Sequence, residues 1–290
     1  MEPVTRVNAA MAKAIKAVQQ DCCPPRFQNA LHDAVLPGGA RVRPKLTLAV
    51  AGACAADDPG LVDAAAVAVE MIHCASLVHD DLPCFDNAAT RRGKPSVHVA
   101  YGERLAVLAG DALIVLAFDT LADASVNHPR RLPALVKVLG SSVAPPAGIA
   151  AGQAWECEPE APLGRYQRQK TGSLFVAATA IGAAAAGSDP GPWCTLGRRI
   201  GEAYQVADDI LDVSADPEEI GKPIGQDQEL HRPNSVLERG MDASEARLKR
   251  LITEALDSIP PCPGEQPLKD LIAAEAKVFI NHALMRSAAA

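Results

Sequence analysis

The chain has 290 residues, of which 48% are hydrophobic and only 3% are aromatic, and its formal net charge is −7. This length suffices for one large domain or two small ones, and abundant alanine with few aromatic residues favours closely packed helices over a sheet sandwich. The negative charge and the lack of a basic stripe argue against nucleic acid as the main partner. No apolar run reaches the roughly 18 residues of a membrane span, and residues 1–18 lack a signal-peptide core, so we expect a cytoplasmic protein without a membrane span.

Helical periodicity dominates the chain, and strand-like alternation is nearly absent. Proline and glycine clusters separate the helical segments, and none of these breaks is long enough for an interdomain linker. We therefore expect an all-α fold: one domain over residues 1–290, built as a bundle of about ten or more helices around a deep apolar cavity. The predicted helices cover residues 5–20, 26–36, 41–56, 60–82, 103–123, 131–143, 147–157, 165–186, 193–214, 242–258 and 266–287.

Eight cysteines are spread along the chain without a CxxC pair, several of them in apolar helical patterns. This distribution favours buried, reduced thiols, and zinc binding or a disulfide framework is the alternative.

Two arginines follow a Gly-Gly turn at the start of the third predicted helix, in the sequence Leu36-Pro37-Gly38-Gly39-Ala40-Arg41-Val42-Arg43-Pro44. The first backbone N–H groups of a helix have no partner within it, so anions bind readily at such a position. Arg41 and Arg43 are therefore candidates for binding an anionic group.

A first acidic motif, Asp80-Asp81-Leu82-Pro83-Cys84-Phe85-Asp86, lies where the fourth predicted helix ends. On an ideal helix Asp86 would point away from Asp80. Pro83 removes a helical hydrogen bond and clashes with the preceding turn, so the helix should end or bulge there. If Pro83 and Cys84 act as a two-residue insertion, Asp86 returns to the position that a residue at i+4 would occupy.

Three further groups of polar residues follow. Arg91 and Arg92 come directly after the first motif, and paired guanidinium groups suit a diphosphate, although a solvated loop is the alternative. Lys170 and Thr171 begin another apolar helix, where a surface lysine is the ordinary interpretation. Lys222 lies between two glycines on a loop that could close over a phosphate.

The second acidic motif consists of Asp208, Asp209 and Asp212, which span about 100° of one helix face, with Gln205 one turn earlier. Clustered carboxylates in apolar helical segments cost too much desolvation to have no function. Hard oxygen ligands of this kind suit Mg²⁺, particularly when a substrate adds phosphate oxygens. The two motifs therefore predict a cavity in which two acidic faces hold a diphosphate through magnesium.

Together these motifs resemble, in order over about residues 35–235, the trans-isoprenyl diphosphate synthase (polyprenyl synthetase) family. The Pro-Cys insertion in the first motif resembles the bacterial and plastid geranylgeranyl diphosphate synthases of carotenoid pathways. The resemblance implies an isoprenoid-synthase-type fold, a homodimer, and Mg²⁺-dependent head-to-tail condensation of isopentenyl diphosphate with an allylic diphosphate (dimethylallyl, geranyl or farnesyl), giving geranylgeranyl diphosphate.

The resemblance also implies residue roles. The metal ligands would be Asp80, Asp81, Asp86, Asp208, Asp209 and Asp212. The allylic diphosphate would be bound by Arg91, Lys170, Thr171, Gln205 and Lys222, and isopentenyl diphosphate by Arg43, His73 and Arg92. Arg232 stands where the family usually has lysine, and Gln153 and Glu156 could brace the metal site. Catalysis itself would rest on Asp80, Asp81, Asp208, Lys170 and Arg91.

Two places in the sequence bear on product length and on the isopentenyl diphosphate site. Ala75 and Ser76 lie about one helical turn before Asp80, where a bulky aromatic residue stops chain growth early in this family, so the small Ala75 favours a twenty-carbon product. The alternative is that Ala75 is ordinary helix packing. The family's Gly-Gly-Lys-Arg reads Gly38-Gly39-Ala40-Arg41 here, which removes one cation from the isopentenyl diphosphate site unless Arg41 or Arg43 compensates.

Three alternatives remain. A farnesyl diphosphate synthase would use the same chemistry and stop one unit earlier. A terpene cyclase would not need Arg43, His73 and Arg92, and it usually lines its cavity with aromatic residues, which are few here. A non-catalytic partner subunit is supported only by Ala40, and the intact acidic motifs oppose it.

Overall fold

The computed structural model describes residues 2–18, 22–36, 38–214, 236 and 239–287. The chain divides into two compact units: a first unit of residues 1–140 and 181–190, and a second unit of residues 141–180 and 191–290. The single domain over residues 1–290 stays a prediction.

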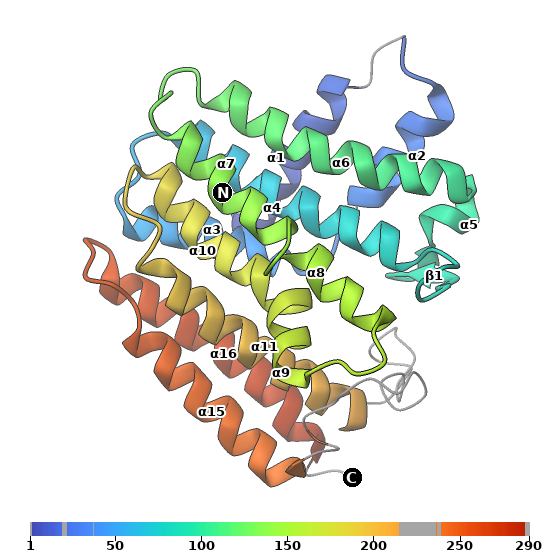
Figure 1. Cartoon of the computed structure of the whole chain (residues 1–290). Helices are drawn as coiled ribbons and strands as arrows, with labels where there is room; N and C mark the ends of the chain where they lie inside the picture. The colour runs from blue at the N-terminus through green and yellow to red at the C-terminus, as the bar shows by residue number, and fades with distance from the viewer. Residues whose placement is uncertain (1, 19–21, 37, 215–235, 237–238, 288–290) are drawn as a thin grey trace. The chain divides into compact units, whose positions relative to one another are not determined.

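The first unit is helical apart from one short hairpin (Figure 1). Its elements are α1 (Pro3–Val18), α2 (Pro25–Val35), α3 (Val42–Ala53), α4 (Pro59–Asp80), β1 (Thr90–Arg91), β2 (Lys94–Pro95), α5 (Val97–Tyr101), α6 (Glu103–Ala124) and the beginning of α7 (Leu132–Val143).

Helix α4 is the centre of the first unit. It begins where the carboxylate of Asp58 accepts hydrogen bonds from the N–H groups of Gly60 and Leu61, and Pro59 at the first helical position needs no such partner. Most of its side chains are buried, because α1, α3 and α6 all pack against it. Alanine and glycine on the buried face of α6 allow a close approach, and a Cβ on Gly110 would collide with the imidazole of His79.

By length and composition alone, α4 and α6 are apolar enough to cross a membrane, although acidic residues interrupt both. The sequence, which has no uninterrupted apolar run of that length, predicted neither of them as a possible membrane span. In α4, 78% of the most apolar stretch is buried inside the protein, as in the core helix of a soluble protein, whereas in α6 the share is 33%. The apolar residues of α6 therefore have no partner within the described part of the chain on much of their surface, and a membrane-free protein stays a prediction.

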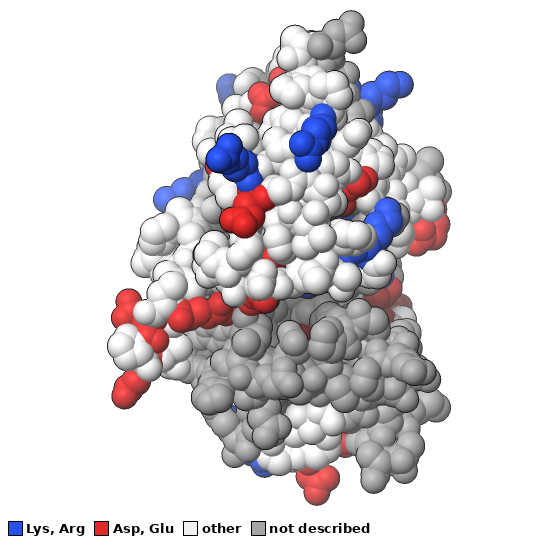
Figure 2. All heavy atoms as spheres, turned by 90° about the vertical axis from the view of Figure 1, so that its right-hand side faces the viewer, with Lys and Arg blue, Asp and Glu red and all other residues white. Residues whose placement is uncertain are grey.

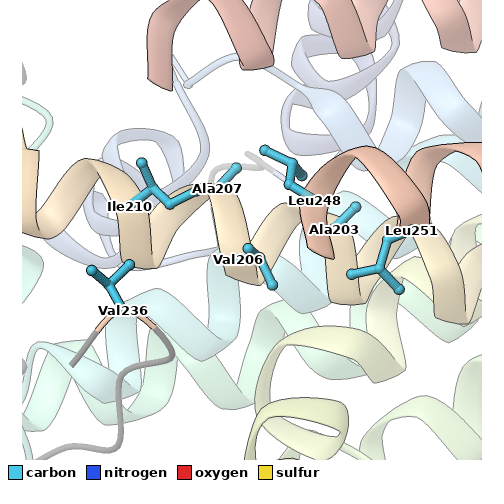
Figure 3. Close-up of a cluster of buried hydrophobic side chains, with 7 residues drawn as sticks. All are labelled: Ala203, Val206, Ala207, Ile210, Val236, Leu248 and Leu251. Carbon is cyan, nitrogen blue, oxygen red and sulfur yellow. The ribbon is translucent and has the colours of Figure 1, made fainter. Parts of the chain in front are cut away.

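The second unit contains the remaining helices, with the end of α10 belonging to the first unit. A core of small and branched side chains joins α11 to α15 and includes Ala203, Val206, Ile210, Leu248 and Leu251 (Figure 3). The elements of the second unit are α8 (Ile149–Ala154), η1 (Trp155–Cys157), α9 (Leu163–Gln167), the π-helical turn η2 (Arg168–Gly172), α10 (Ser173–Ala185), α11 (Trp193–Ser214), α15 (Met241–Asp257) and α16 (Glu265–Ser287).

The predicted all-α fold is confirmed, and the long helices lie within a few residues of their expected bounds. The deep cavity stays a prediction. The β1–β2 hairpin and the short α5 were not expected. The expectation of buried thiols is wrong for most cysteines: none of the eight is in a disulfide, but only Cys74 is buried, and Cys22, Cys84 and Cys157 are exposed.

Candidate active site

The first acidic motif lies at the end of α4. The helix ends at Asp80, three residues before Pro83, and a run of turns follows, as the proline predicts. The backbone N–H of Asp86 then donates to the carbonyl of Asp80 at 2.9 Å. This bond returns the chain to the helix end, so that the turn places Asp86 beside Asp80.

Arg91 binds the first motif directly. Its Nε lies 3.0 Å and 3.3 Å from the two carboxylate oxygens of Asp81, and its Nη2 also donates to Oδ1. Asp81 is buried. Burial alone would lower the pKa of Arg91, but the hydrogen bonds to Asp81 and the charges of Asp80 and Asp86 outweigh it and raise that pKa. Arg91 and the three carboxylates therefore form one electrostatic group.

The β1–β2 hairpin separates the two arginines. Arg91 pairs with Lys94 across the hairpin, while Arg92 and Gly93 form its two-residue turn with φ of 54° and 75°. Positive φ at both central residues is the geometry that closes tight hairpins. Arg92 is consequently exposed at the tip, while Arg91 stays with the carboxylates. The only sequence signal for this turn was the Gly after Arg92, which is weaker than an Asn-Gly pair.

Arg92 lies beside the Gly-Gly turn. A Cβ on Gly39 would lie 3.0 Å from the guanidinium carbon of Arg92. His73 is half-buried on α4, and burial, followed by the positive charges of Arg43, Arg92, Arg41 and Arg91, lowers its pKa well below the usual value. The imidazole is therefore neutral near pH 7. The structure thus brings the three predicted isopentenyl diphosphate ligands, Arg43, His73 and Arg92, into one electropositive region.

Arg41 does not belong to that region as a ligand. Its side chain is fully buried and donates to Glu70 at 2.7 Å, to Asn8 at 3.0 Å and to the carbonyl of Val35 at 2.5 Å. Ala40, by contrast, is exposed. The possibility that Arg41 replaces the missing lysine is therefore wrong in this structure, because its charge is already paired inside the protein. Glu70 was not anticipated, since a glutamate in an apolar helix gives no hint of its partner.

Two glutamines hold the second acidic motif. Gln205 donates to Oδ1 of Asp209 at 2.8 Å from one turn earlier on α11, as the predicted helix face implied. Gln167 on α9 donates to the other oxygen at 3.3 Å. Asp209 is buried and Asp208 is half-buried. Asp212 lies on the same helix, but its side chain is outside the described part of the structure. Gln167 was missed, because a lone glutamine carries no motif signal.

Lys170 lies in the π-helical turn η2 and is paired with Glu156. Its Nζ is 2.5 Å from Oε1 of Glu156, which also accepts from the hydroxyl of Tyr166 at 2.6 Å. Gln153 donates to the other oxygen of Glu156 at 2.9 Å. A Cβ on Gly152 would collide with the backbone of Lys170, so α8 and η2 approach closely only because this residue is glycine. Of the two predicted bracing residues, Glu156 contacts the predicted substrate ligand Lys170, and Gln153 contacts Glu156. Their role in bracing the metal site stays a prediction.

The remaining predicted residues are placed as follows. Thr171 is half-buried in η2 next to Lys170. Ala75 is buried on α4, and the hydroxyl of Ser76 donates to the carbonyl of His73 at 2.8 Å. Lys222 and Arg232 lie outside the described residues.

Among the described residues, no three His, Cys, Asp or Glu side chains converge closely enough to hold a metal ion by themselves. Asp81 faces Arg91 and Asp209 faces two glutamines, and the side chain of Asp212 lies outside the described part of the structure. Mg²⁺ is commonly held by one or two carboxylates together with substrate phosphates and waters rather than by a protein cage. The carboxylate donors present therefore suit magnesium in chemical type, with a diphosphate completing the coordination.

Comparison with known proteins gives one family model, similar sequences and a similar crystal structure. The polyprenyl synthetase family model matches residues 24–264. A geranylgeranyl diphosphate synthase of Cereibacter sphaeroides is 53% identical over 275 residues, 95% of this chain and 96% of that protein. A geranylgeranyl diphosphate synthase of Rhodobacter capsulatus is 49% identical over 92% of each chain. A crystal structure of geranyltransferase from Helicobacter pylori, complexed with magnesium and isoprenyl diphosphate, has a TM-score of 0.79, 29% identity, and coverage of 96% of this chain and 98% of that one.

Proposed function

Because the chain belongs to the polyprenyl synthetase family, we propose that it condenses isopentenyl diphosphate with an allylic diphosphate, head to tail, to give geranylgeranyl diphosphate. The two relatives of 53% and 49% identity carry that activity in their names. A farnesyl diphosphate synthase, with the same chemistry and a shorter product, is the second candidate.

The observation that carries the proposal is the pair of oppositely charged regions in the first unit. One contains the carboxylates of Asp80, Asp81 and Asp86 with Arg91. The other contains Arg43, Arg92 and neutral His73, whose pKa is lowered by burial and then by the charges of the neighbouring arginines. A reaction that joins two diphosphate esters needs a second anion site that does not depend on the metal-binding carboxylates. A terpene cyclase, which takes one diphosphate, has no use for it.

Magnesium is the proposed cofactor. The described carboxylates that would hold it are Asp80, Asp81, Asp86, Asp208 and Asp209, and Asp212 completes the proposed set. When bound, the metal neutralises the charge of the allylic diphosphate and makes it a better leaving group. The support for Mg²⁺ is the donor chemistry of these residues and the magnesium in the Helicobacter pylori structure.

The side chains of this protein then have separate tasks. The proposed ligands of the allylic diphosphate are Arg91, Lys170, Thr171, Gln205 and Lys222. Their donors stabilise the negative charge that grows as the carbon–oxygen bond breaks. Arg43, His73 and Arg92 hold isopentenyl diphosphate so that its double bond attacks the allylic carbon. The new carbon–carbon bond forms with the electrons of that double bond, and a proton then passes to the released diphosphate. Arg232 is proposed to contribute a further charge near the diphosphates.

Lys170 and Arg91 would each gain a further partner when substrate binds. In this structure Lys170 is bound to Glu156 and Arg91 to Asp81. Each pair fixes a long, flexible cation before the diphosphate arrives, so less conformational entropy is lost on binding. The diphosphate oxygens then add to these contacts.

Product length is proposed to depend on Ala75. This residue is buried on α4, five residues before Asp80, and its methyl group leaves room for a growing chain that a larger side chain would occupy. Ser76, the next residue, is tied to the carbonyl of His73 and so keeps a fixed orientation. A small residue at this depth favours the twenty-carbon product over the fifteen-carbon one.

We also propose a homodimer, with α5 and α6 at its interface. Val99, Val107, Leu108 and Val115 are exposed to 54%, 41%, 52% and 67%, which is a large apolar surface for adjoining helices. On the face drawn in Figure 2, charged side chains of both signs stand in small separate groups among uncharged residues. Light scattering after gel filtration should give twice the chain mass, and Leu108→Lys with Val115→Lys should give the monomer mass. Val136→Lys on α7, 40% exposed, is the matched control and should leave the dimer intact.

The test of the proposed reaction is direct. The purified chain is incubated with Mg²⁺, isopentenyl diphosphate and each allylic primer in turn, and the products are separated by length. Geranylgeranyl diphosphate from farnesyl diphosphate is the expected result. A main product of fifteen carbons would favour the second candidate, and no condensation with any primer would contradict the reaction itself.

A further inference from the structure

Arg41 occupies an unusual position for a charged residue. It lies in the left-handed region, with φ 51° and ψ 38°, immediately before α3, and its side chain has no exposed surface. A buried, uncompensated guanidinium would be very costly, so its contacts must satisfy both its charge and its donors. Three protein oxygens do so, from Asn8 on α1, from Val35 at the end of α2 and from Glu70 in the middle of α4.

The Gly-Gly turn is shaped around this guanidinium. Gly38 has φ 79°, and a Cβ at this position would collide with the Arg41 guanidinium. Gly39, one residue on, lies against Arg92. The turn therefore contacts a buried arginine on one side and a substrate-binding arginine on the other, and Arg41 fixes it to the core.

Glu70 connects this anchor to the substrate site along α4. Glu70, His73 and Cys74 are at i, i+3 and i+4, so they lie on one face of the helix. Cys74 Sγ lies 4.0 Å from Arg41, and burial, with the charge of Glu70 next, raises the pKa of Cys74 to about 12. Arg43 follows Arg41 by two residues, at the start of α3. Arg43 therefore lies within one turn of Arg41, and His73 lies within one turn of Glu70. The ion pair between Arg41 and Glu70 thus fixes Arg43 and His73 in relation to each other.

We propose that the Arg41–Glu70 ion pair is a positioning device for the isopentenyl diphosphate site, which sets the placement of Arg43 against His73 without contacting the substrate. This inference rests on the proposed function, and it assigns to the pair a role in the affinity for one substrate only.

The sign of one variant separates positioning from direct binding. Glu70→Gln keeps the shape of Glu70 and the positive charge of Arg41 but removes the negative charge that attracts it, so that only a hydrogen bond to a neutral amide can remain. If the pair positions the site, the KM for isopentenyl diphosphate should rise about tenfold, with the allylic KM and kcat little changed. If Arg41 were a substrate ligand held back by Glu70, the same variant should lower that KM, and an unchanged or lowered KM would overturn the proposal.

The control is Asp63→Asn. Asp63 also lies on α4 and binds an arginine of α1, Arg6, at 2.6 Å, but this pair is part-exposed and seven residues from Glu70. Asp63→Asn should leave the KM values for isopentenyl diphosphate and for the allylic substrate unchanged. Because Glu70→Gln leaves a buried charge unpaired, it is accompanied by Arg41→Met with Glu70→Leu, which removes both charges and often preserves folding. A folded double variant with the wild-type KM for isopentenyl diphosphate would also contradict the proposal.

A second measurement needs no turnover. Trypsin cannot reach the buried Arg41 in the native protein, and the bond after Arg43 resists cleavage because Pro44 follows it. Mass spectrometry of a timed digest should show faster cleavage after Arg41 in Glu70→Gln than in wild type or Asp63→Asn. Equal rates would mean that the pair does not anchor the turn, whereas a wild-type protein with no condensation activity but the expected digest would contradict only the proposed function.

Discussion

Glu156 accepts two hydrogen bonds on one oxygen, from Lys170 at 2.5 Å and from the hydroxyl of Tyr166 at 2.6 Å. Lys170 lies in η2 and Tyr166 in α9, so one carboxylate on η1 fixes both ends of a turn that carries a proposed substrate ligand. Tyr166 is buried, and the centroid of its ring is 5.8 Å from the ammonium group of Lys170.

Tyr166→Phe should loosen this arrangement without removing any proposed ligand. The loss of one hydrogen bond to a charged group should cost about 1.5–3 kcal/mol of stability. The KM for the allylic substrate should rise severalfold, because Glu156 holds Lys170 less firmly, while the KM for isopentenyl diphosphate stays the same. Chemical denaturation and steady-state kinetics test the two parts, and an equal rise in both KM values would contradict the assignment of Lys170 to the allylic site.

The acidic motifs should both be essential. Asp80→Ala and Asp208→Ala should each lower turnover by orders of magnitude while leaving the fold intact, since both remove proposed metal ligands that are only half-buried. Turnover at saturating Mg²⁺ and circular dichroism are the measurements. Asp242→Ala, at an exposed position in the first turn of α15, is the control and should retain activity. Near-normal turnover of either motif variant would refute the proposal that both motifs hold the metal.

Ala75→Tyr should shorten the main product to fifteen carbons or fewer. Ala75 is buried at 1% exposure, and under the proposed path of the growing chain the ring would occupy space that the chain needs; overpacking should also cost about 1–3 kcal/mol. Product chromatography and thermal unfolding are compared with Ala68→Tyr, an equally buried alanine two turns earlier on α4. The control should lose similar stability but keep the twenty-carbon product. Unchanged length from folded Ala75→Tyr would move the floor of the pocket to Met71 or Phe118.

Ala40→Lys should strengthen isopentenyl diphosphate binding. Ala40 is exposed beside Gly39 and hence near Arg92, and Arg41 cannot supply the charge because it is paired with Glu70. A well-placed charged contact of about 1.5–3 kcal/mol should lower the KM for isopentenyl diphosphate about tenfold or more, with little effect on the primer. Ala274→Lys, exposed on α16, adds the same charge elsewhere and should change neither value. No effect of Ala40→Lys would mean that Arg43 or Arg92 already saturates the site.

Stability should decrease as the pH is lowered below about 6.5, because of His73. Burial and neighbouring arginines lower its folded pKa well below 6.5, so the unfolded chain binds a proton that the folded protein refuses. The free energy of unfolding should therefore be constant above about pH 6.5 and decrease below it, by up to about 1.4 kcal/mol per pH unit, until the folded pKa is reached. Denaturation curves between pH 5 and 8 should show a smaller slope for His73→Gln. Equal slopes would mean that His73 has the ordinary pKa of a histidine in the folded protein.

The sequence alone was sufficient for the helices, because apolar spacing and the proline–glycine breaks act over a few residues. The bounds of α4, α6 and α11 follow from such local signals, and so does the end of α4 near Pro83. The family and its acidic motifs were equally readable, since each motif is a run of neighbouring residues whose chemistry does not depend on the rest of the chain.

The tertiary structure decided which charges meet. Sequence left Arg41 and Arg43 as equal candidates to replace a lysine, and only packing showed that Arg41 is paired with Glu70, 29 residues away. In the same way Gln167 reached Asp209, and Tyr166 reached Glu156, across gaps that no short motif spans. The reason is physical: whether an arginine binds substrate or supports the core depends on burial and on the nearest carboxylate, and both arise from contacts between helices.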